Sequence, residues 1–344
     1  MRPQRFCRPA GDARMTSSMK ISVIGTGSIG RRHIGNFLSI GARVIAFDSD
    51  PAMRDRTRGM HPAATYAESL DAALDGADGV AICTPPDSHV ALGQRALAAG
   101  AHLMIEKPIA HTVDGLEELL KACDAARKAV LTAYNWRYWP PMHKVQELLQ
   151  QERIGKVLVA RTEYSYDVTQ RYQGKPARRF YMSNAAQGGG AILDESHAVD
   201  YMRWHLGEAA EVFAVIDRIS TLDQDSDDVC EVIVRFERGI LGNLHMDLFA
   251  PVMHGHFEFI GERGMLRWDR ALNQVSVFDS AAQRWEVYPF GCQLNDMYVD
   301  EARHFLDCIQ GKTAPACDGW DGLKTLQLCL AAVRSSAERR WVRP

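Results

Sequence analysis

The stretch Lys20-Ile-Ser-Val-Ile-Gly25-Thr-Gly-Ser-Ile-Gly30 decides the fold of the first half of this chain. A short apolar run at residues 21–24 leads directly into three closely spaced glycines. Apolar residues then recur at helical spacing through residues 28–39, and Gly41 ends that pattern. We therefore expect a strand, a glycine-rich turn and a helix in direct succession.

Each glycine of the turn has a physical reason to be there. Gly25 permits a tight turn, Gly27 lets the backbone approach a pyrophosphate, and Gly30 lets helix and strand pack closely. An acid follows at the matching distance, because Asp48 ends the next expected strand, 18 residues after Gly30. Strand, glycines, helix and acid in register predict a dinucleotide site, with the phosphates at the helix N-terminus. The expected contacts from the turn are Gly25, Gly27, Ser28, Ile29 and Gly30.

Asp48 also bears on the choice of dinucleotide. A carboxylate at this place suits both ribose hydroxyls and repels a 2′-phosphate, which favours NAD over NADP. Arg54 follows six residues later and could turn toward a 2′-phosphate, so NADP stays open as an alternative.

Strands and helices alternate in the first 150 residues. Apolar runs predict strands at residues 43–47, 79–83, 102–105 and 130–133, with helices at 88–99 and 113–128 between them. Short apolar strands alternating with helices predict a doubly wound parallel sheet that is buried on both faces.

The pattern changes after about residue 150. Consecutive strands are expected at residues 229–236, 242–248, 256–260, 274–278 and 285–288, with apolar residues alternating along the first two. Such alternation is typical of a mainly antiparallel sheet with one face on a core. Two helices are expected near the end, and their apolar stripes are Val299, Ala302, Leu306 and Ile309, then Leu323, Leu326, Leu330 and Val333.

These patterns divide the chain into a leader, residues 1–18, and two domains, residues 19–137 and 138–344. Arg2, Arg5, Arg8 and Arg14 make the leader basic, and no apolar stretch follows that could serve in secretion. We interpret it as a disordered, dispensable leader or as an extension from a start upstream of Met19, with a transit peptide as the alternative.

Composition excludes several classes of protein. The 344 residues carry a formal net charge of −3 and 46% hydrophobic residues, which is typical of a globular chain without a nucleic-acid partner. No apolar run approaches the roughly 20 residues that span a bilayer, so no membrane association is expected. The eight cysteines are scattered without a Cys-x-x-Cys pair, which is typical of reduced thiols in the cytoplasm.

Further motifs identify a known family. Thr84-Pro-Pro-x-x-His89 follows one expected strand, Glu106-Lys-Pro108 follows the next, and Tyr134-Asn-Trp-Arg137 follows a third. Gly188-Gly-Gly-Ala-Ile-Leu-Asp194 comes later and leads to His197 and Asp200. With Gly25–Gly30, these motifs resemble the glucose–fructose oxidoreductase / inositol dehydrogenase family of NAD(P)-dependent oxidoreductases, from Lys20 nearly to the C-terminus.

The resemblance implies an α/β fold in two parts and an oxidoreductase activity. The parts are an N-terminal Rossmann domain and a C-terminal α/β domain with a large open, mainly antiparallel sheet. That sheet often serves oligomerisation in the family, so a homodimer or homotetramer is expected. The reaction implied is hydride transfer between NAD(P) and a hydroxyl or keto carbon of a sugar, sugar derivative or cyclitol.

The resemblance also implies which residues surround the reacting carbon. These are Lys107, Asp194 and His197, with Lys107 as acid/base. The commoner family pattern places four steps between the aspartate and the histidine, whereas this chain has three. We interpret the difference as a one-residue deletion before the helix, which leaves the assignment of His197 firmer than that of Asp194.

The chemistry of hydride transfer requires a base beside the reacting hydroxyl, and Lys107 can serve as one. Hydride departure from an alcohol leaves an alkoxide-like oxygen, so a nearby group must take the hydroxyl proton. A lysine with its usual pKa near 10.4 is a poor base at neutral pH, but burial or a neighbouring cation lowers that value. Lys107 follows a strand of the predicted parallel sheet, where ligand crevices lie; the plainer alternative is a solvated surface lysine.

Other residues complete the expected site. Thr84, Pro85 and His89 should border the nicotinamide ribose, and Asn135 and Arg137 should reach the same crevice after a later strand. His197 could instead be a helix-N-terminal residue bonded to backbone. The cofactor set thus adds Asp48, Thr84, Pro85, His89, Glu106, Lys107, Asn135 and Arg137. The substrate set is Lys107, Asn135, Arg178, Arg179, Asp194 and His197.

Arg178 and Arg179 belong to the set because four cations gather at residues 171–179 in an acidic chain. A guanidinium binds carboxylate or phosphate in bidentate fashion, so this cluster favours an anionic substrate such as a sugar acid or nucleotide-activated sugar. The alternative is a solvated basic loop and a plain polyol substrate.

Asp223-x-Asp225-x-Asp227 has the spacing of a calcium loop but lacks its glycine and final glutamate. We interpret it as a solvated turn between strands, and no paired-histidine pattern occurs elsewhere, so no metal is expected.

Two other functions stay open on the same fold: a non-catalytic NAD(P)-binding regulator and a reductase of a non-sugar substrate.

Overall fold

The computed structural model describes residues 19–171 and 180–344. The leader, together with Arg178 and Arg179, lies outside the described residues. The described chain divides into two compact units. One unit contains the residues up to Tyr138 together with Gln293–Leu323, and the other contains Trp139–Cys292 together with Lys324–Pro344.

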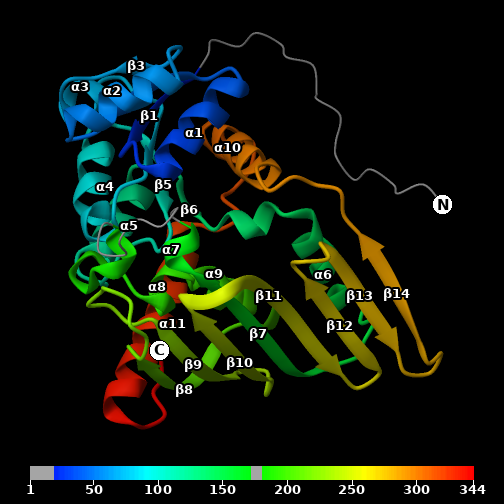
Figure 1. Cartoon of the computed structure of the whole chain (residues 1–344). Helices are drawn as coiled ribbons and strands as arrows, with labels where there is room; N and C mark the ends of the chain where they lie inside the picture. The colour runs from blue at the N-terminus through cyan, green and yellow to red at the C-terminus, as the bar shows by residue number, and fades with distance from the viewer. Residues whose placement is uncertain (1–18, 172–179) are drawn as a thin grey trace. The chain divides into compact units, whose positions relative to one another are not determined.

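The first unit is built on a six-stranded parallel sheet in the order β3-β2-β1-β4-β5-β6. Its inner strands are short and apolar, and the core side chains of β1 and β4 are almost completely buried because helices cover both faces (Figure 1). The predicted doubly wound sheet is thereby confirmed. The strands are β1 (Lys20–Ile24), β2 (Arg43–Phe47), β3 (Thr65–Tyr66), β4 (Gly79–Ile82), β5 (His102–Glu106) and β6 (Val130–Ala133).

The helices of this unit connect successive strands. Helix α1 (Ser28–Ser39) follows the glycine turn, and its buried face carries His33, Ile34 and Phe37. Asp50 caps the N-terminus of α2 with its side chain, as Ser69 does for α3, because these oxygens accept backbone amides that the helix leaves unpaired. The remaining bounds are α2 (Pro51–Met60), α3 (Leu70–Leu74), α4 (His89–Ala98), α5 (Leu116–Ala125) and the short 3₁₀ helices η1 (Pro86–Ser88) and η2 (Asn135–Tyr138).

One late helix belongs to this unit rather than to the C-terminal domain in which the sequence analysis placed it. Helix α10 (Asp296–Ile309) packs on α1, and the Phe37 and Phe305 rings lie 6.3 Å apart edge to face. Its buried stripe is Met297, Glu301, Ala302, Phe305 and Cys308. The expected stripe through Val299 and Leu306 is displaced by about one residue position from the observed one, which includes the buried Glu301.

The second unit is built on an eight-stranded sheet in the order β14-β13-β12-β11-β7-β10-β9-β8. All neighbouring strands are antiparallel except β7 and β10, which confirms the mainly antiparallel sheet. Cys230, Val232, Val234 and Phe236 are buried on one face of β9, as their alternation predicted. The strands are β7 (Val157–Asp167), β8 (Ala209–Asp217), β9 (Val229–Phe236), β10 (Leu241–Asp247), β11 (Phe249–Gly261), β12 (Gly264–Asp269), β13 (Gln274–Asp279) and β14 (Arg284–Pro289).

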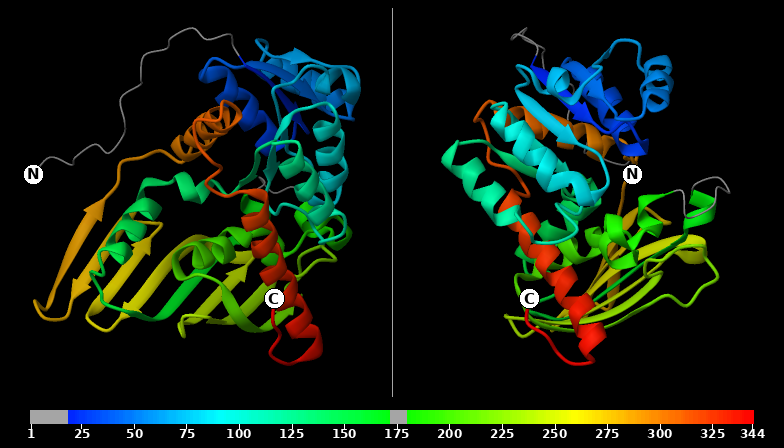
Figure 2. Two further views of the ribbon diagram at one scale, coloured as in Figure 1. Left: turned by 180° about the vertical axis from the view of Figure 1, so that it is seen from behind. Right: turned by 90° about the vertical axis from the view of Figure 1, so that its left-hand side faces the viewer.

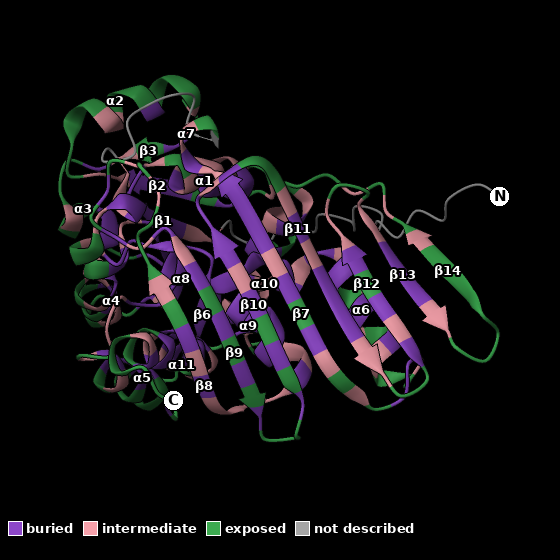
Figure 3. Cartoon of the chain, turned by 60° about the horizontal axis from the view of Figure 1, so that its bottom comes forward, coloured by how far each residue is buried: buried purple, intermediate pink, exposed green. Residues whose placement is uncertain are grey.

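Helices cover one face of this sheet. Helix α6 (Pro140–Gln150) packs on β12 and β13, and α9 (Ser196–Leu206) packs on β7 and β10, as the views in Figure 2 also show. Figure 3 shows the opposite face, and buried and exposed residues alternate along β9 and β10. Three strands of this sheet, β7, β8 and β12, were not predicted from the sequence, and neither was the short β3 of the first sheet.

The remaining helices of the described residues are α7 (Val168–Arg171), η4 (Tyr181–Ser183), η5 (Ala185–Gln187), α8 (Ala191–Asp194) and α11 (Gly319–Glu338). Among the helices of the described residues, none has the length and apolar content that crossing a bilayer requires.

Candidate active site

The glycine turn after β1 has the geometry of a phosphate cradle. Gly25 adopts φ +90°, and a Cβ on it would lie 2.8 Å from the backbone of Cys83. A Cβ on Gly30 would lie 1.9 Å from the carbonyl oxygen of Gly25, so helix α1 can approach the turn only because Gly30 has no side chain.

The middle glycine faces open space. A Cβ on Gly27 would meet nothing within 4 Å, and no side chain caps the N-terminus of α1. The first amides of a helix lack partners within the helix and favour anions. Ser28 is exposed and Ile29 half-buried in this first turn. The residues therefore fit a dinucleotide pyrophosphate at this helix end.

Asp48 lies beside the same turn, at the end of β2. Its Oδ2 accepts the backbone amide of Thr26 at 2.7 Å and the Thr26 hydroxyl at 3.1 Å, while its Oδ1 accepts the amide of Asp50 at 3.0 Å. Arg54 donates to the Asp48 carbonyl oxygen at 2.7 Å and to the Glu68 carboxylate at 3.0 Å. The guanidinium that could have met a 2′-phosphate is thus engaged with Glu68, which weakens the case for NADP.

His89 connects the loops that follow β4 and β5. Its Nε2 lies 2.9 Å from the Thr84 carbonyl oxygen, and its Nδ1 lies 3.1 Å from that of Pro108. The ring is completely buried, and this burial lowers the pKa of His89. His89 thus lies between Thr84 and Pro108, in the loops that follow two neighbouring strands, and its contact with the cofactor stays a prediction. Thr84 and Pro85 are half-buried, and the Thr84 hydroxyl bonds that of Ser88.

Lys107 follows β5 directly and is half-buried. The preceding Glu106 turns inward, where its Oε1 lies 2.7 Å from Nε2 of the fully buried His33. Its Oε2 accepts the backbone amide of Lys107 at 3.2 Å. Glu106 therefore fixes the backbone that carries Lys107, and its predicted contact with the cofactor stays a prediction.

A second carboxyl lies close to this pair. Glu301 on α10 is completely buried, and neither of its oxygens has a hydrogen-bond partner among the described residues. Burial, with a smaller contribution from the negative charge of Glu106, raises the pKa of Glu301 well above its usual value. Burial thus favours the neutral form of the Glu301 carboxyl over its carboxylate.

The two residues expected from the loop after β6 have different surroundings. Arg137 is buried, and its guanidinium pairs with Asp321 at 2.6 Å and donates to the Ala316 carbonyl oxygen at 2.7 Å. Arg137 thus supports residues 316–321, and its contact with the cofactor stays a prediction. Asn135 is also buried, and within the described residues its Oδ1 accepts no hydrogen bond.

The triple-glycine motif lies in the second unit. Gly190 adopts φ +117° immediately before α8, whose last residue is Asp194. The buried Asp194 carboxylate accepts the hydroxyls of Tyr166 at 2.9 Å and Tyr181 at 2.6 Å. Only Glu195 separates α8 from α9, and His197 lies in the first turn of α9 with 9% of its surface exposed. The short stretch from Asp194 to His197 thus contains the break between α8 and α9.

The sequence analysis missed His33, Glu301, Tyr166 and Tyr181. For the first two a signal was present: each is a polar residue four positions before a phenylalanine on an apolar helix stripe. A polar side chain on an apolar helix stripe is expected to be buried, and a buried polar side chain normally needs a hydrogen-bond partner or a functional reason. The tyrosines lie in segments for which no strand or turn had been predicted, so no signal pointed to them.

The folds of the two units, the glycine cradle and Asp48 together define a nucleotide-binding oxidoreductase scaffold. Residues 19–134 match a family model described as an oxidoreductase family with an NAD-binding Rossmann fold, and residues 142–267 match one described as the GFO/IDH/MocA C-terminal domain. The chain belongs to the GFO/IDH/MocA family of oxidoreductases, which confirms the resemblance seen in the sequence.

Individual relatives cover almost the whole chain. A myo-inositol 2-dehydrogenase of Thermotoga maritima is 27% identical over 94% of this chain and 98% of its own length. A 1,5-anhydro-D-fructose reductase of Ensifer adhaerens is 25% identical over 92% of this chain and 95% of its own. The solved structure of a levoglucosan dehydrogenase in complex with NADH has a TM-score of 0.86 at 20% identity, covering 95% of this chain and 99% of the other.

Proposed function

We propose that this protein transfers a hydride between NAD and a hydroxyl or keto carbon of a sugar, sugar derivative or cyclitol, with Lys107 as acid/base. The observation that carries the proposal is the arrangement of three neighbouring strands. Strands β1, β4 and β5 are adjacent and parallel, so the glycine cradle, Thr84 and Lys107 follow their carboxyl ends at one edge of the sheet. That edge is where open α/β sheets bind ligands.

NAD, when bound at the cradle, supplies the hydride acceptor or donor. In the oxidation direction Lys107 takes the hydroxyl proton while the carbinol hydrogen leaves as hydride, and in reduction Lys107 returns the proton. Glu106 and His33 hold the Lys107 backbone, and His89 ties the loop of Lys107 to that of Thr84. A fixed base needs no reorientation when the proton moves, which is how positioning lowers a barrier.

Asp194 and His197 are proposed as the groups of the second unit that bind the reacting substrate. The Asp194 carboxylate accepts hydrogen bonds from two tyrosine hydroxyls, so it is oriented before any substrate binds. His197 can donate to or accept from a sugar hydroxyl, because neutral imidazole offers one donor and one acceptor. The cyclitol and sugar substrates named for the relatives make this class the first to test.

The experiment is a substrate screen read by NADH absorbance. The protein is mixed with NAD and with each member of a panel of inositols, aldoses, anhydro sugars and sugar acids, and with NADH and the corresponding ketones. Turnover with at least one sugar or cyclitol supports the proposal. NADH binding without turnover across the panel favours the non-catalytic regulator, and turnover with non-sugar carbonyls alone favours the alternative reductase.

We also propose that two copies of the chain associate through the uncovered face of the eight-stranded sheet. Acidic and basic side chains alternate there across neighbouring strands: Glu231 on β9, His245 on β10, Glu163 on β7 and His256 on β11. His245 bonds Glu231 at 2.6 Å, and His256 lies 3.7 Å from Glu163. A patch with both signs in alternation can face a second copy of itself about a two-fold axis.

A further inference from the structure

We propose that the acidic loop, residues 223–228, clamps the triple-glycine segment, residues 181–194, and that Asp227 is a positioning residue for the substrate groups on that segment. The inference deepens the proposed function and rests on it, because the groups that the loop would position, Asp194 and His197, are the proposed substrate-binding groups. The sequence analysis interpreted this loop as a solvated turn. In the structure, its side chains bond the very segment that leads to Asp194.

The first half of the loop holds the start of the segment. The backbone amide of Asp225 donates to the Ser183 carbonyl oxygen at 3.1 Å, and the Asp225 Oδ1 accepts the amide of Ala185 at 2.7 Å. The Ser226 hydroxyl donates to the Met182 carbonyl oxygen at 2.7 Å. Three hydrogen bonds thus fix the backbone of η4 and the start of η5, and η4 carries the tyrosine that bonds Asp194.

Asp227 holds the end of the segment. Its Oδ2 accepts the amide of Ile192 at 3.2 Å, and its carbonyl oxygen accepts the amide of Ala191 at 3.1 Å. A Cβ on Gly190 would lie 2.1 Å from the Asp227 Oδ1, so the carboxylate can approach only because residue 190 is glycine. The third glycine of the motif therefore serves this contact as well as its own left-handed conformation.

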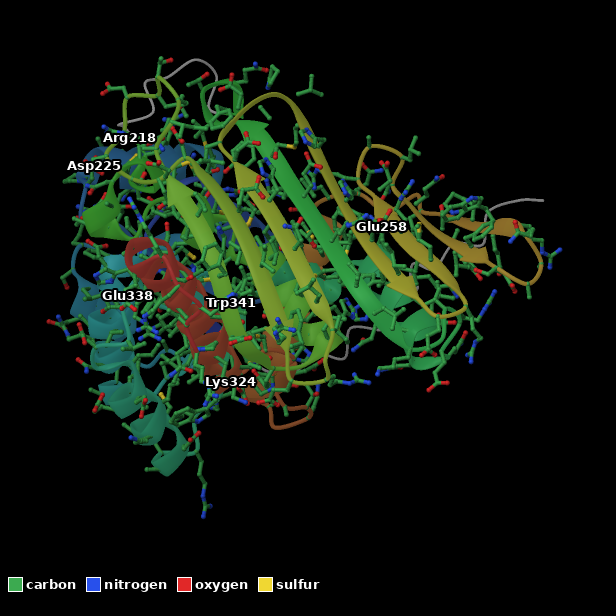
Figure 4. All side chains as sticks on the ribbon, turned by 90° about the horizontal axis from the view of Figure 1, so that it is seen from below. Arg218, Asp225, Glu258, Lys324, Glu338 and Trp341 are labelled. Atoms are coloured by element: carbon green, nitrogen blue, oxygen red, sulfur yellow. The ribbon has the colours of Figure 1, made fainter. Side chains whose placement is uncertain are left out.

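The loop is itself braced from behind. Asp228 is buried, and its carboxylate accepts the amides of Ile219 at 2.9 Å and Ser220 at 3.1 Å. Arg218 donates to the Gln224 carbonyl oxygen, and Figure 4 shows Arg218 and Asp225 at the same corner of the unit. A braced loop can hold a neighbouring segment in one place, whereas a solvated turn cannot.

The clamp acts on the substrate groups through the backbone. The amide of Asp194 donates to the Gly190 carbonyl oxygen at 2.9 Å, which closes the single turn of α8. Asp227 bonds the first two amides of that turn, so a shift at residues 190–192 moves Asp194 and, one residue beyond α8, the start of α9 with His197. A displacement of about 1 Å at such groups is enough to lower activity strongly.

The clamp is expected to respond to pH. Burial raises the pKa of Asp227 to about 6, the amides of Ile192 and Ala191 oppose this, and the charge of Asp228 adds to it. Cys230 on β9 and Cys329 on α11 are the other titratable groups that interact with it. Above pH 6 the ionised carboxylate accepts a charge-assisted bond from Ile192. Below pH 6 the neutral acid accepts a weaker one.

The test compares Asp227→Asn and Asp227→Ala with the parent, and uses Asp279→Asn as the matched control. Asp279 also accepts two backbone amides, those of Ala281 and Ala282, in a turn of the same unit, and four strands separate β13 from β9. Two readouts are needed: kcat and KM for the sugar found in the screen between pH 5 and 8, and amide hydrogen exchange of residues 181–195 without substrate.

In the parent, kcat/KM is expected to fall as pH drops through about 6. Asp227→Asn imitates the neutral acid, so its kcat/KM at pH 7.5 should be about fivefold lower, mainly through KM. Its decline on acidification should be smaller than that of the parent by the same factor, because only the dependence on Lys107 remains. Asp227→Ala should lose tenfold or more, and in both variants residues 190–195 should exchange faster than in Asp279→Asn. The dissociation constant of NADH should not change.

Parent-like exchange and a parent-like pH profile in Asp227→Asn would overturn the inference and leave the proposed function standing. A parent protein that turns over no sugar would overturn the proposed function instead, and the exchange measurement would still decide whether the clamp exists. An equal loss in Asp279→Asn would show a general effect on the unit and would also overturn the assignment of Asp227.

Discussion

Asp48 shows how a single carboxylate can act on a ligand through a backbone turn. It accepts the Thr26 amide between Gly25 and Gly27, so one oxygen shapes the cradle while its charge sets the electrostatics of the ribose site. Arg54 is held by Glu68 and the Asp48 carbonyl oxygen. No guanidinium therefore offsets the negative charge of Asp48 toward a 2′-phosphate, and this arrangement favours NAD over NADP.

Asp48→Ser should move the cofactor preference toward NADP. Removing the carboxylate lifts its repulsion of a 2′-phosphate, so the ratio of kcat/KM for NADP to that for NAD should rise about tenfold or more. Asp50→Ser is the matched control, because Asp50 caps α2 and serine keeps that function. A parent enzyme that already prefers NADP would contradict this assignment of Asp48.

Single residues also show where sequence reasoning stops. The glycines and Asp48 could be predicted because their roles depend on local backbone geometry and short spacing. Arg137 and His89 could not, because their partners, Asp321 and the Pro108 carbonyl oxygen, become neighbours only in the folded chain. The motifs predict where the site lies, whereas the hydrogen-bond partners of its residues become visible only in the tertiary contacts.

At the scale of elements, α10 has the most informative placement. It completes the core of the nucleotide-binding unit, where Phe305 packs on Phe37 and the His33 and Tyr298 rings lie 6.2 Å apart. The sequence predicted that a helix occurs here, because its apolar periodicity is strong. The sheet that this helix covers could not be predicted, because an apolar stripe shows that one helix face is buried but not which element it packs on. Strands β7 and β8 were missed because polar residues such as Arg161 and Glu163 interrupt them on the open face.

Glu301 on α10 should make the stability of the protein depend on pH. Its folded-state pKa is raised above the unfolded value, so its contribution to the free energy of unfolding is present below about pH 4.5 and is lost as pH rises toward the folded pKa. Glu301→Gln cannot ionise. Its Tm should match that of the parent near pH 4 and exceed it at pH 8 by about 2 °C or more.

Thermal unfolding of Glu301→Gln, measured between pH 4 and 8, checks this expectation. Glu118→Gln is the control, because Glu118 is exposed on α5 in the same unit and its replacement should leave the pH dependence unchanged. A difference between Glu301→Gln and parent that is constant across the range would mean that Glu301 ionises normally in the folded protein.

At the scale of the whole molecule, one face of the large sheet stays uncovered in the chain itself. Figure 4 shows this face with Glu258 near its centre, where Glu258 pairs with Arg161 at 3.3 Å and Arg267 at 2.8 Å. Apolar Ile233 and Leu241 are 37% and 41% exposed on the same face. A face with exposed apolar residues among paired charges is typical of a protein interface.

Introducing charge on this face should dissociate the assembly. The double variant Ile233→Glu and Leu241→Glu places two carboxylates on neighbouring strands, so sedimentation at micromolar concentration should show a lower mass than for the parent. Val113→Glu is the control, because Val113 is 40% exposed in the other unit. A parent that sediments as a monomer would contradict association through this face.

The central claim is that Lys107 moves the proton in a hydride transfer, and the most direct measurement is the turnover of Lys107→Met. With the sugar identified by the screen, its kcat should fall about 100-fold or more while the dissociation constant of NADH stays within about twofold of the parent value. Lys121→Met, which removes an exposed lysine of α5 from the same unit, should keep full activity. A Lys107→Met enzyme with unchanged kcat would contradict the account, because some other group would then have to take the proton.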